Sequence, residues 1–375
     1  MPLHTLALTL CPGIGHVIAR RLVTEVGSAE EVFRRRKELP DLIPDLQPAV
    51  VRALDCSEAL RRATEEMRFV EAHGITCLTF TDPAYPSRLR ECIDAPVILF
   101  FQGNTDLNAP HIVSVVGTRR STDYGHQFCE AFARDLARLV PGTVVVSGLA
   151  YGTDIHAHRA AMATGLPTVA VLAHGLDRIY PPEHRQWAMD MRACGGLLTE
   201  YPSRTRPDRF NFVGRNRIIA GMADATVVVE SAERGGALIT ASLANGYNRD
   251  CFALPGRVND PQSQGCNHLI RDDGATLIQS AQDLVERMNW AAPQPKAHTE
   301  PIQGNLFPDL TPEQECIVSI LSRQGGSLDI NTLSVRANIS IVRLSPLLMD
   351  MELEGIISNR AGGNVVLRLP MPSAH

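Results

Sequence analysis

Short apolar runs that alternate with amphipathic segments constrain the fold of this 375-residue chain more than any other feature. The apolar runs are rich in β-branched residues and span 112–116, 143–147, 168–172, 225–229, 251–254 and 275–278. Segments with helical periodicity lie between or after them, at 126–139, 155–164, 183–193, 215–222, 237–247 and 280–288. Continuous apolar strands separated by helices are typical of parallel sheets that are buried on both faces. The pattern therefore predicts an α/β fold with a doubly wound, mostly parallel sheet.

The sheet region, 75–290, is flanked by segments of different character. Residues 1–70 look helical and are predicted to form a small domain of their own. Residues 291–309 hold four prolines and little apolar content, which indicates an extended linker.

The last block, 310–370, combines helices with a short hairpin. Its helical patterns span 312–323, 330–337 and 341–354. The hairpin "IISNRAGGNVVLRL" follows and is expected to turn at Gly362 and Gly363. Helices followed by a two-stranded wing predict a winged-helix domain.

Charge and cysteine usage limit the classes of protein to which the chain can belong. The nine cysteines are scattered without a C-x-x-C pair, which argues for reduced thiols and against a disulfide framework or a zinc site. No apolar run approaches the roughly 18 residues of a membrane span, and the N-terminus lacks signal-peptide features. The formal net charge is −5, whereas proteins that coat nucleic acid non-specifically are usually basic. We therefore expect a cytoplasmic protein without a membrane partner, in which any polyanion site is local.

Glycines recur directly after the predicted strands, at the edge where parallel sheets bind ligands. Gly117 and Gly148 follow the first two runs, and later loops carry Gly235, Gly236 and Gly265. Glycine lets the backbone approach a ligand closely, and each helix start adds bare N–H groups worth about half a positive charge. Four such loops on one edge, together with arginine, predict a site for an extended anion.

Familiar nucleotide-binding signatures are missing from the sequence. It contains no G-x-x-x-x-G-K-[ST] P-loop, and "GTRRST" does not match the dinucleotide fingerprint G-x-G-x-x-G. Arg119 and Arg120 would crowd a pyrophosphate at that turn. We therefore expect no NAD, FAD or ATP, and no other cofactor.

The densest basic segment, "SRTRPDRFNFVGRNRIIAG", runs over 203–221. It carries five arginines against one acid, Asp208, and Phe210 and Phe212 lie among them. Arginines pair with phosphates and aromatic rings stack on bases, at about 1–3 kcal/mol per base, so the composition suits a single-stranded nucleic acid. The alternative is that the phenylalanines fill the core while the arginines are solvated. The Arg-Asn-Arg triplet at 215–217, at the start of a helix, favours binding.

Candidates for catalysis or metal binding are weak. Asp154, His156 and His158 resemble a metal cluster, but residues i and i+2 of a helix point about 200° apart, and Asp154 is more simply an N-cap. No G-x-S-x-G nucleophile motif occurs, and Glu200 and Glu230 are more simply satisfied or solvated carboxylates. The sequence therefore predicts no catalytic residue, no metal site and no enzyme.

Several motifs taken together resemble one family, DNA-processing protein A (DprA/Smf). In family order they are "YPSRLRECIDAPVILFFQGN", "VVGTRRSTDYG", "VVSGLAYGTDIHAHRAAM", "TVAVLAHGLDRIYPPEH", "LLTEYP", "FVGRNRIIAGM", "GALITASLAN" and "CFALPGRVNDPQSQGCNHLIRDDGATLI". The resemblance implies an extended Rossmann-like core that binds single-stranded DNA. It also implies a role in natural transformation, in which such proteins protect incoming strands and load the RecA recombinase. A homodimer without an established catalytic activity is implied as well.

The resemblance also assigns site residues, because family motifs can be matched to positions of this sequence. The family's G-[ST]-R loop falls on 117–119, its R-N-R element on 215–217 and its G-C-N on 265–267. With the glycine loops and the aromatic segment, the predicted nucleic-acid-binding set is Gly117, Thr118, Arg119, Ser147, Gly148, Phe212, Arg215, Asn216, Arg217, Gly235, Gly236, Thr240, Gly265 and Asn267. Departures from the family are Gly235 in place of serine, Val213 in place of proline and Tyr151 in place of arginine.

Two flanking elements leave alternatives open. "LCPGIGHVIARRLV" (10–23) resembles a helix-hairpin-helix element that offers N–H groups to a DNA phosphate, but a tight turn between core helices explains it as well. The winged helix offers only Arg343 against three acids on its would-be recognition helix, which favours a protein-contact or regulatory role. The sequence does not define a dimer interface.

Two other functions also remain open. The lysine-decarboxylase-like group uses a similar sheet to hydrolyse nucleoside monophosphates, with a catalytic glutamate in G-G-x-G-T-x-x-E. Here "GGALITAS" (235–242) has no glutamate in reach, which argues against that hydrolase. Alternatively, the chain is an adaptor that acts mainly through its linker and winged helix.

Overall fold

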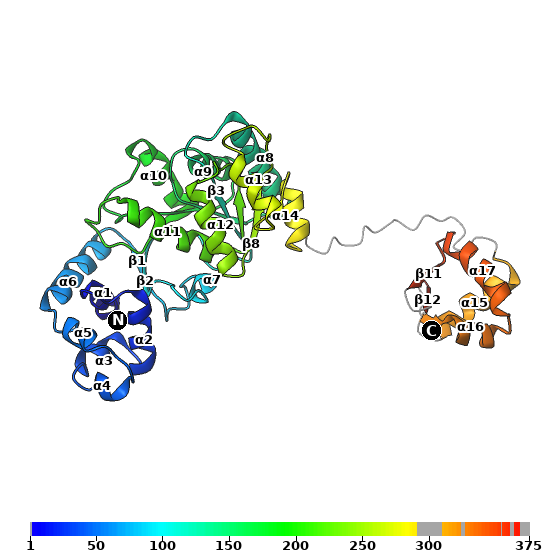
Figure 1. Ribbon diagram of the computed structural model, residues 1–375, viewed down its shortest axis with the longest axis horizontal. Coiled ribbons are helices and arrows are strands. Elements are labelled where there is room, and N and C mark those ends of the chain that lie inside the picture. Colours follow the sequence, from blue (N-terminus) through cyan, green and yellow to red (C-terminus); the bar gives the residue numbers. More distant parts are fainter. Residues whose placement is uncertain (1, 291–309, 324–326, 354, 361–363, 368–375) are drawn as a thin grey trace. The chain divides into compact units, whose positions relative to one another are not determined.

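The structure is a computed structural model. It describes residues 2–290, 310–323, 327–353, 355–360 and 364–367 (Figure 1). Residues 1–293 form one compact unit and 294–375 a second. The predicted linker, 291–309, and the predicted turn at Gly362 and Gly363 lie outside the described residues. No described helix is both long and apolar enough to cross a membrane.

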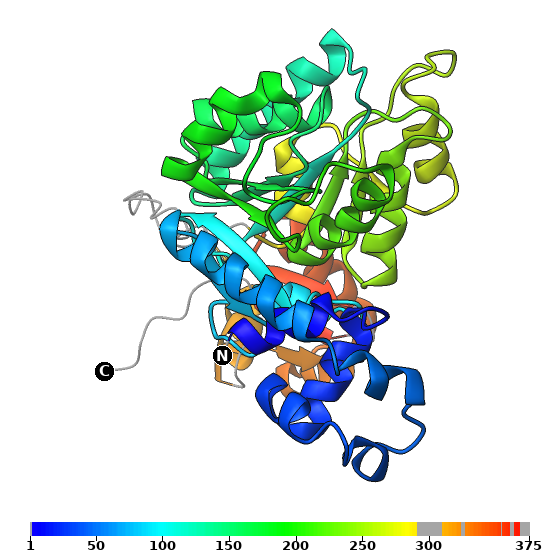
Figure 2. The same ribbon diagram turned by 90° about the vertical axis from the view of Figure 1, so that its left-hand side faces the viewer.

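The N-terminal segment is helical, as predicted. Its helices are α1 (Pro2–Leu10), α2 (His16–Val26), α3 (Ala29–Arg34), α4 (Leu39–Leu42), α5 (Pro48–Ala53) and α6 (Ser57–Ala72). Leu6 of α1, Val70 of α6 and Phe100 of the second strand belong to one buried cluster, and Figure 2 shows the helices beside this edge of the sheet. These helices therefore share a core with the sheet, and a separate domain ending near residue 70 stays a prediction.

The large sheet has nine strands in the order β1-β2-β6-β5-β4-β3-β7-β8-β9. The strands are β1 (Thr76–Thr79), β2 (Ile98–Gly103), β3 (Ile112–Val116), β4 (Val144–Ser147), β5 (Thr168–Val171), β6 (Gly195–Thr199), β7 (Ala225–Val228), β8 (Asp250–Ala253) and β9 (Thr276–Leu277). From β6 to β9 all neighbours are parallel, whereas β1 and β2 add an antiparallel edge. The six predicted apolar runs are confirmed as strands, and β1, β2 and β6 were not predicted from them.

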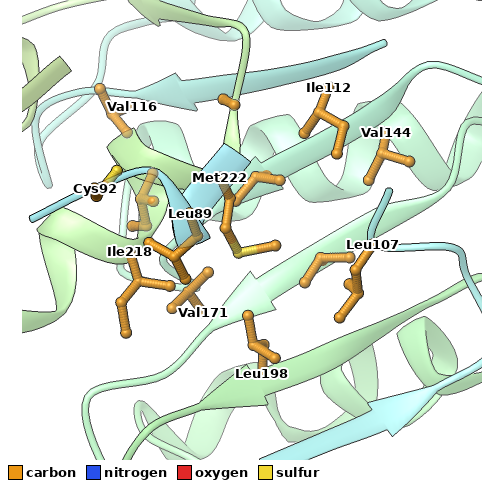
Figure 3. Packing of buried hydrophobic residues seen from close by; sticks show 14 of the residues in the cluster. Leu89, Cys92, Leu107, Ile112, Val116, Val144, Val171, Leu198, Ile218 and Met222 are labelled. Atoms are coloured by element: carbon orange, nitrogen blue, oxygen red, sulfur yellow. The ribbon is translucent and has the colours of Figure 1, made fainter. Parts of the chain in front are cut away.

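Helices cover both faces of this sheet. They are α7 (Ser87–Arg90), α8 (Asp123–Leu139), α9 (Thr153–Ala163), α10 (Arg185–Cys194), α11 (Arg209–Met222), α12 (Gly236–Gly246), α13 (Gln264–Arg271) and α14 (Ala281–Arg287), with a short 3₁₀ turn at Pro182–His184. Val113 and Val115 of β3 pack with α8, α9 and α14. Ile112 and Val116 pack with α11 and α12 on the opposite face (Figure 3). The predicted doubly wound, Rossmann-like sheet is thus confirmed.

The strand order places a topological switch point between β3 and β7. The chain leaves β3 through α8 toward β4, on one side, and leaves β7 through α12 toward β8, on the other. The loops that follow β3 and β7 therefore diverge and leave a crevice at the carboxyl ends of the strands.

The second unit consists of α15 (Pro312–Arg323), β10 (Ser327–Asp329), α16 (Ile330–Ala337), α17 (Ile341–Leu353), β11 (Ile357–Arg360) and β12 (Asn364–Leu367). Its strands form an antiparallel sheet in the order β10-β12-β11. Ile317, Leu333 and Leu348 of the three helices pack with Val365 in its core. The predicted helices and hairpin strands are present, β10 was not predicted, and the winged-helix interpretation stays a prediction.

Candidate nucleic-acid interface

A pocket of about 250 Å³, here called the crevice pocket, lies at the switch point. Its lining comes from the loop after β3, from α11 and from the loop that leads into α12. Nine of the fourteen predicted site residues line it: Gly117, Thr118, Arg119, Phe212, Arg215, Asn216, Gly235, Gly236 and Thr240. The fold therefore brings together residues that span more than a hundred positions of the sequence.

The N-terminus of α12 opens onto the crevice pocket. Gly235 is the N-cap, and no side chain caps the helix. Gly236 follows, and a Cβ added there would meet nothing within 4 Å. The first N–H groups of a helix have no intrahelical partner and carry partial positive charge. With the hydroxyl-bearing Thr240 one turn later in the same pocket, this end of α12 suits an anion.

The N-terminus of α8, by contrast, is filled by a carboxylate of the protein. Glu230 is 1% exposed and accepts hydrogen bonds from the N–H of Thr122 at 2.8 Å and from its hydroxyl at 2.6 Å. Thr122 is the N-cap of α8. A negative charge therefore lies beside the start of α8 and disfavours an anion there.

The loop after β4 is closed in a similar way. Asp154 accepts hydrogen bonds from the N–H groups of Gly148, at 3.2 Å, and Ala150, at 3.3 Å, and is not the N-cap of α9, which is Gly152. Arg215 donates to the carbonyls of Gly148, at 2.9 Å, and Val171. A Cβ on Gly148 would lie within 2.7 Å of both charged side chains. Gly148 thus permits a buried contact and does not line the crevice pocket.

Asp154 and Arg215 are an internal charge pair. Burial raises the pKa of Asp154, and the charge of Arg215 opposes that rise. Burial also lowers the pKa of Arg215 to about 10, so its guanidinium stays charged at neutral pH. Because the two charges offset each other, Arg119 supplies the uncompensated side-chain charge of the crevice pocket.

Arg217 does not reach the crevice pocket. Its guanidinium donates to the carboxylate of Glu200 and, at 2.7 Å, to the carbonyl of Asp94. Glu200 is 4% exposed and also lies 2.6 Å from Nε2 of His16, the first residue of α2. The structure therefore places Arg217 in a buried link between the N-terminal hairpin and the sheet, where the sequence led us to expect a DNA contact.

Three further predicted residues also lie outside the crevice pocket. The hydroxyl of Ser147 donates to the carbonyl of Val115 at 2.6 Å. The N–H of Gly265 donates to the carbonyl of Ser231 at 2.8 Å. Asn267 exchanges two hydrogen bonds with the backbone of Gly256, both at 3.1 Å. These contacts stabilise the loops that surround the pocket.

The side chains of Asp154, His156 and His158, at the start of α9, do not meet at one point. The ring of His156 stacks on His126, with 3.5 Å between centroids, whereas His158 is buried and hydrogen-bonds Thr168 at 2.7 Å. Among the residues that the structure describes, no cluster of three or more His, Cys, Asp or Glu side chains could hold a metal ion.

Exposed arginines without an acidic partner follow four strands of the parallel part of the sheet. Within 2–290, none of the six has a carboxylate within 4 Å of its guanidinium: Arg119, Arg120, Arg206, Arg209, Arg234 and Arg257. They follow β3, β6, β7 and β8, and parallel strands end at one edge of a sheet. The predicted set contained only Arg119. The signal that identifies the others is arginine in the segment between a strand and the helix that follows it.

Aromatic side chains lie beside Arg119. Its guanidinium lies 5.2 Å from the ring centroid of Phe212, and the ring of Tyr180 lies 5.7 Å from that of Phe212. Tyr180 was not in the predicted set. Tyr151, which stands in place of the family's arginine, donates its hydroxyl to Glu183 at 2.7 Å and lines neither this region nor the crevice pocket.

The chain is similar in sequence to one family of known proteins. Residues 76–289 match the family model described as DNA recombination-mediator protein A. The Smf protein of Synechocystis sp. is 35% identical over 289 residues, which cover 75% of this chain and 71% of that protein. DNA processing protein DprA of Streptococcus pneumoniae is 41% identical over 209 residues, 56% of this chain and 73% of that protein.

Two solved structures are similar to the chain. The X-ray structure of DNA processing protein A from Streptococcus pneumoniae has a TM-score of 0.56 at 32% identity and covers 73% of this chain and 98% of that one. DNA processing protein A from Helicobacter pylori, described for its single-stranded DNA binding mode, has a TM-score of 0.52 at 30% identity. That match covers 58% of this chain and 96% of the other.

Proposed function

The chain belongs to the DNA recombination-mediator protein A family, and on that premise we propose that it binds single-stranded DNA along the carboxyl edge of its parallel sheet. The observation that carries the proposal is the row of exposed, acid-free arginines on the loops after β3, β6, β7 and β8. Arginine pairs with phosphate bidentately, so these loops give a chain of net charge −5 a local site for a polyanion.

A phosphate of the strand lies in the crevice pocket. The open N–H of Gly236 at the start of α12 faces it, the hydroxyl of Thr240 lies one turn further, and Arg119 supplies the charge. Neighbouring phosphates follow the edge in both directions, toward Arg209 on one side and Arg234 on the other. This arrangement holds the sugar–phosphate backbone without reading sequence.

The protein acts by binding and not by turnover. Among the described residues, Asp154 is the one carboxylate that lines the crevice pocket. It faces Arg215 and accepts hydrogen bonds from the backbone of the β4 loop. A hydrolase of the lysine-decarboxylase-like group would need a free acid against the nucleotide. Incubation of the pure protein with nucleoside monophosphates should release no base, and release would favour that hydrolase.

The biological role rests on family membership. The protein protects incoming single strands, loads the RecA recombinase during natural transformation, and works as a homodimer in the cytoplasm. A role as an adaptor through residues 291–375 is the second candidate. The division of the chain into two compact units is the observation that favours it.

A titration with single- and double-stranded DNA at two salt concentrations tests the central proposal. The single strand should bind more tightly, and its affinity should fall with salt at a log–log slope of about −0.7 per phosphate neutralised. A protein that binds neither form, or whose binding does not change with salt, would refute an arginine-lined phosphate track.

A further inference from the structure

We propose that helix α17 of the second unit pairs in antiparallel orientation with α17 of a second copy of this chain. One face of this 13-residue helix is used within the unit, because Leu344, Leu348 and Met351 are buried in its core. The opposite face is apolar as well, and it is exposed. The pairing does not depend on DNA binding, and it adds a contact to the proposed homodimer.

The exposed face carries a row of residues, here called the outer stripe: Val342, Pro346, Met349 and Leu353. The exposed fractions of Val342, Met349 and Leu353 are 86%, 65% and 80%. The first three members each precede a core residue by two positions, which turns them about 200° away from it around the helix. Single exposed apolar residues are common on protein surfaces, but a contiguous apolar patch indicates an interaction site.

The spacing of the outer stripe is that of a coiled-coil seam. Its members are separated by four, three and four residues, as are successive d, a, d and a positions of a heptad repeat. The stripe is also symmetric about its centre. In an antiparallel pair, Val342 meets Leu353 of the second copy, and Pro346 meets Met349 of the second copy. The stripe is therefore complementary to itself, as an interface with two-fold symmetry requires.

The charges beside the stripe select the antiparallel orientation. Arg343 and Asp350 occupy the e positions that flank the seam. The e positions of two antiparallel helices face each other, so Arg343 lies opposite Asp350 of the second copy, and symmetry repeats the pair. In a parallel pair, Asp350 would lie opposite Ser345. Arg343 also contacts Glu313 of its own chain at 2.9 Å, but its side chain is 72% exposed and a guanidinium has five N–H donors.

Duplex DNA fits this face less well than a second copy does. Arg343 is the one basic residue of α17, which disfavours the phosphates of a DNA groove. The pairing is nevertheless weak on its own, because a helix of this length spans about 20 Å and buries less area than the roughly 1,200–2,000 Å² of a stable interface. In the proposed homodimer, the chain holds the two helices at a high effective concentration, which is sufficient for a weak contact.

Cysteine cross-linking of the full-length chain tests the pairing. The exposed Cys194 and Cys316 are first replaced by serine to remove background. The double variant Val342→Cys/Leu353→Cys should then form a disulfide-linked dimer under mild oxidation. The two cysteines lie about 16 Å apart on one helix, so they cannot link within a chain. Neither single variant should link, because antiparallel pairing separates identical positions.

Val335→Cys/Leu353→Cys is the matched control. Val335 is 80% exposed but lies on α16, off the outer stripe, so this variant should not form the linked dimer. In the Val342→Cys/Leu353→Cys chain, Asp350→Arg should lower the yield of linked dimer several-fold, and the further change Arg343→Asp should restore it.

Three outcomes would overturn the pairing. They are the absence of a linked dimer in the double variant, equal linking by Val342→Cys alone, and loss of the linked dimer on addition of duplex DNA, which would assign the face to DNA. A wild-type chain that sediments as a monomer would instead refute the proposed homodimer. Cross-linking at high protein concentration would still decide whether the α17 helices pair.

Discussion

The carboxylate of Glu66 accepts hydrogen bonds from both the backbone N–H of Ser203, at 2.7 Å, and its hydroxyl, at 2.5 Å. Glu66 lies on α6 and is 2% exposed, and Ser203 opens the loop that carries Arg206 and Arg209. Arg62, one turn earlier on α6, bonds the same carboxylate at 2.8 Å and the carbonyl of Ser203 at 2.6 Å. The N-terminal helices therefore hold an arginine-bearing loop of the candidate DNA edge in position.

Glu66→Ala should lower both stability and DNA affinity. The substitution removes two hydrogen bonds to a buried carboxylate and leaves Arg62 without its acid, which costs about 3 kcal/mol of unfolding free energy. Single-strand affinity should fall because the loop with Arg206 and Arg209 is released. Chemical denaturation and a binding titration measure the two effects. Glu58→Ala, at an exposed position of the same helix, should change neither, and an equal loss there would contradict the explanation.

Arg119→Ala should weaken binding to all single-stranded sequences alike. The lost contact is to phosphate, so the log–log salt slope should become shallower by about 0.7. Binding isotherms over a range of salt concentrations measure the slope. The control is Arg138→Ala, because Arg138 lies in the last turn of α8, away from the loops at the carboxyl edge. Unchanged affinity in Arg119→Ala would remove this residue from the site.

Gly236→Ala should separate stability from binding. Alanine is a better helix former than glycine by up to about 1 kcal/mol, and its Cβ would contact nothing within 4 Å. The same methyl group obstructs the open N–H groups of α12, so single-strand affinity should fall on the order of tenfold, as for a lost hydrogen bond to a charged group. Gly246→Ala at the other end of α12, also without a neighbour within 4 Å, should be stabilising without loss of binding. Equal affinity of the two variants would exclude an anion at this helix start.

Glu200 should make the fold sensitive to acid. Burial raises its pKa, but the hydrogen bond from His16 and the charge of Arg217 outweigh burial and hold the pKa below its ordinary value of 4.5. The carboxylate of Glu200 is then protonated more readily in the unfolded chain than in the folded one. Ionised Glu200 therefore stabilises the folded state at neutral pH, and this stabilisation is lost as the pH falls below about 4.5. Unfolding free energies across pH should show Glu200→Gln less stable by about 2–4 kcal/mol at neutral pH. The difference from wild type should shrink in acid, and a constant difference would argue against the ionised link.

Deletion of residues 291–375 should leave single-strand affinity unchanged. The crevice pocket lies wholly within the first compact unit. A RecA-loading assay on the same variant tests the adaptor candidate, since loss of loading with intact DNA binding would support it. A large loss of DNA affinity would instead show that the second unit contributes directly to the interface.

The sequence by itself determined the parallel sheet and the edge on which the site lies. The six apolar runs became strands because strands buried on both faces must be apolar throughout. The sequence did not predict β6, because this strand begins with Gly195 and Gly196 and glycine has low β propensity. Glycine is needed there because the backbone of the neighbouring strand lies very close. A Cβ on Gly195 would lie 1.9 Å from the carbonyl oxygen of Thr168.

Only the tertiary structure decided which arginines are available. Arg209, Arg215 and Arg217 stand in one basic motif. Arg215 faces Asp154, and Arg217 pairs with Glu200. Arg209, by contrast, has no carboxylate within 4 Å among the residues described. The sequence shows where charges lie along the chain. Whether a charge is free to bind DNA depends on how deeply folding buries it and on which carboxylates lie near it, because a buried guanidinium must be compensated to offset its desolvation.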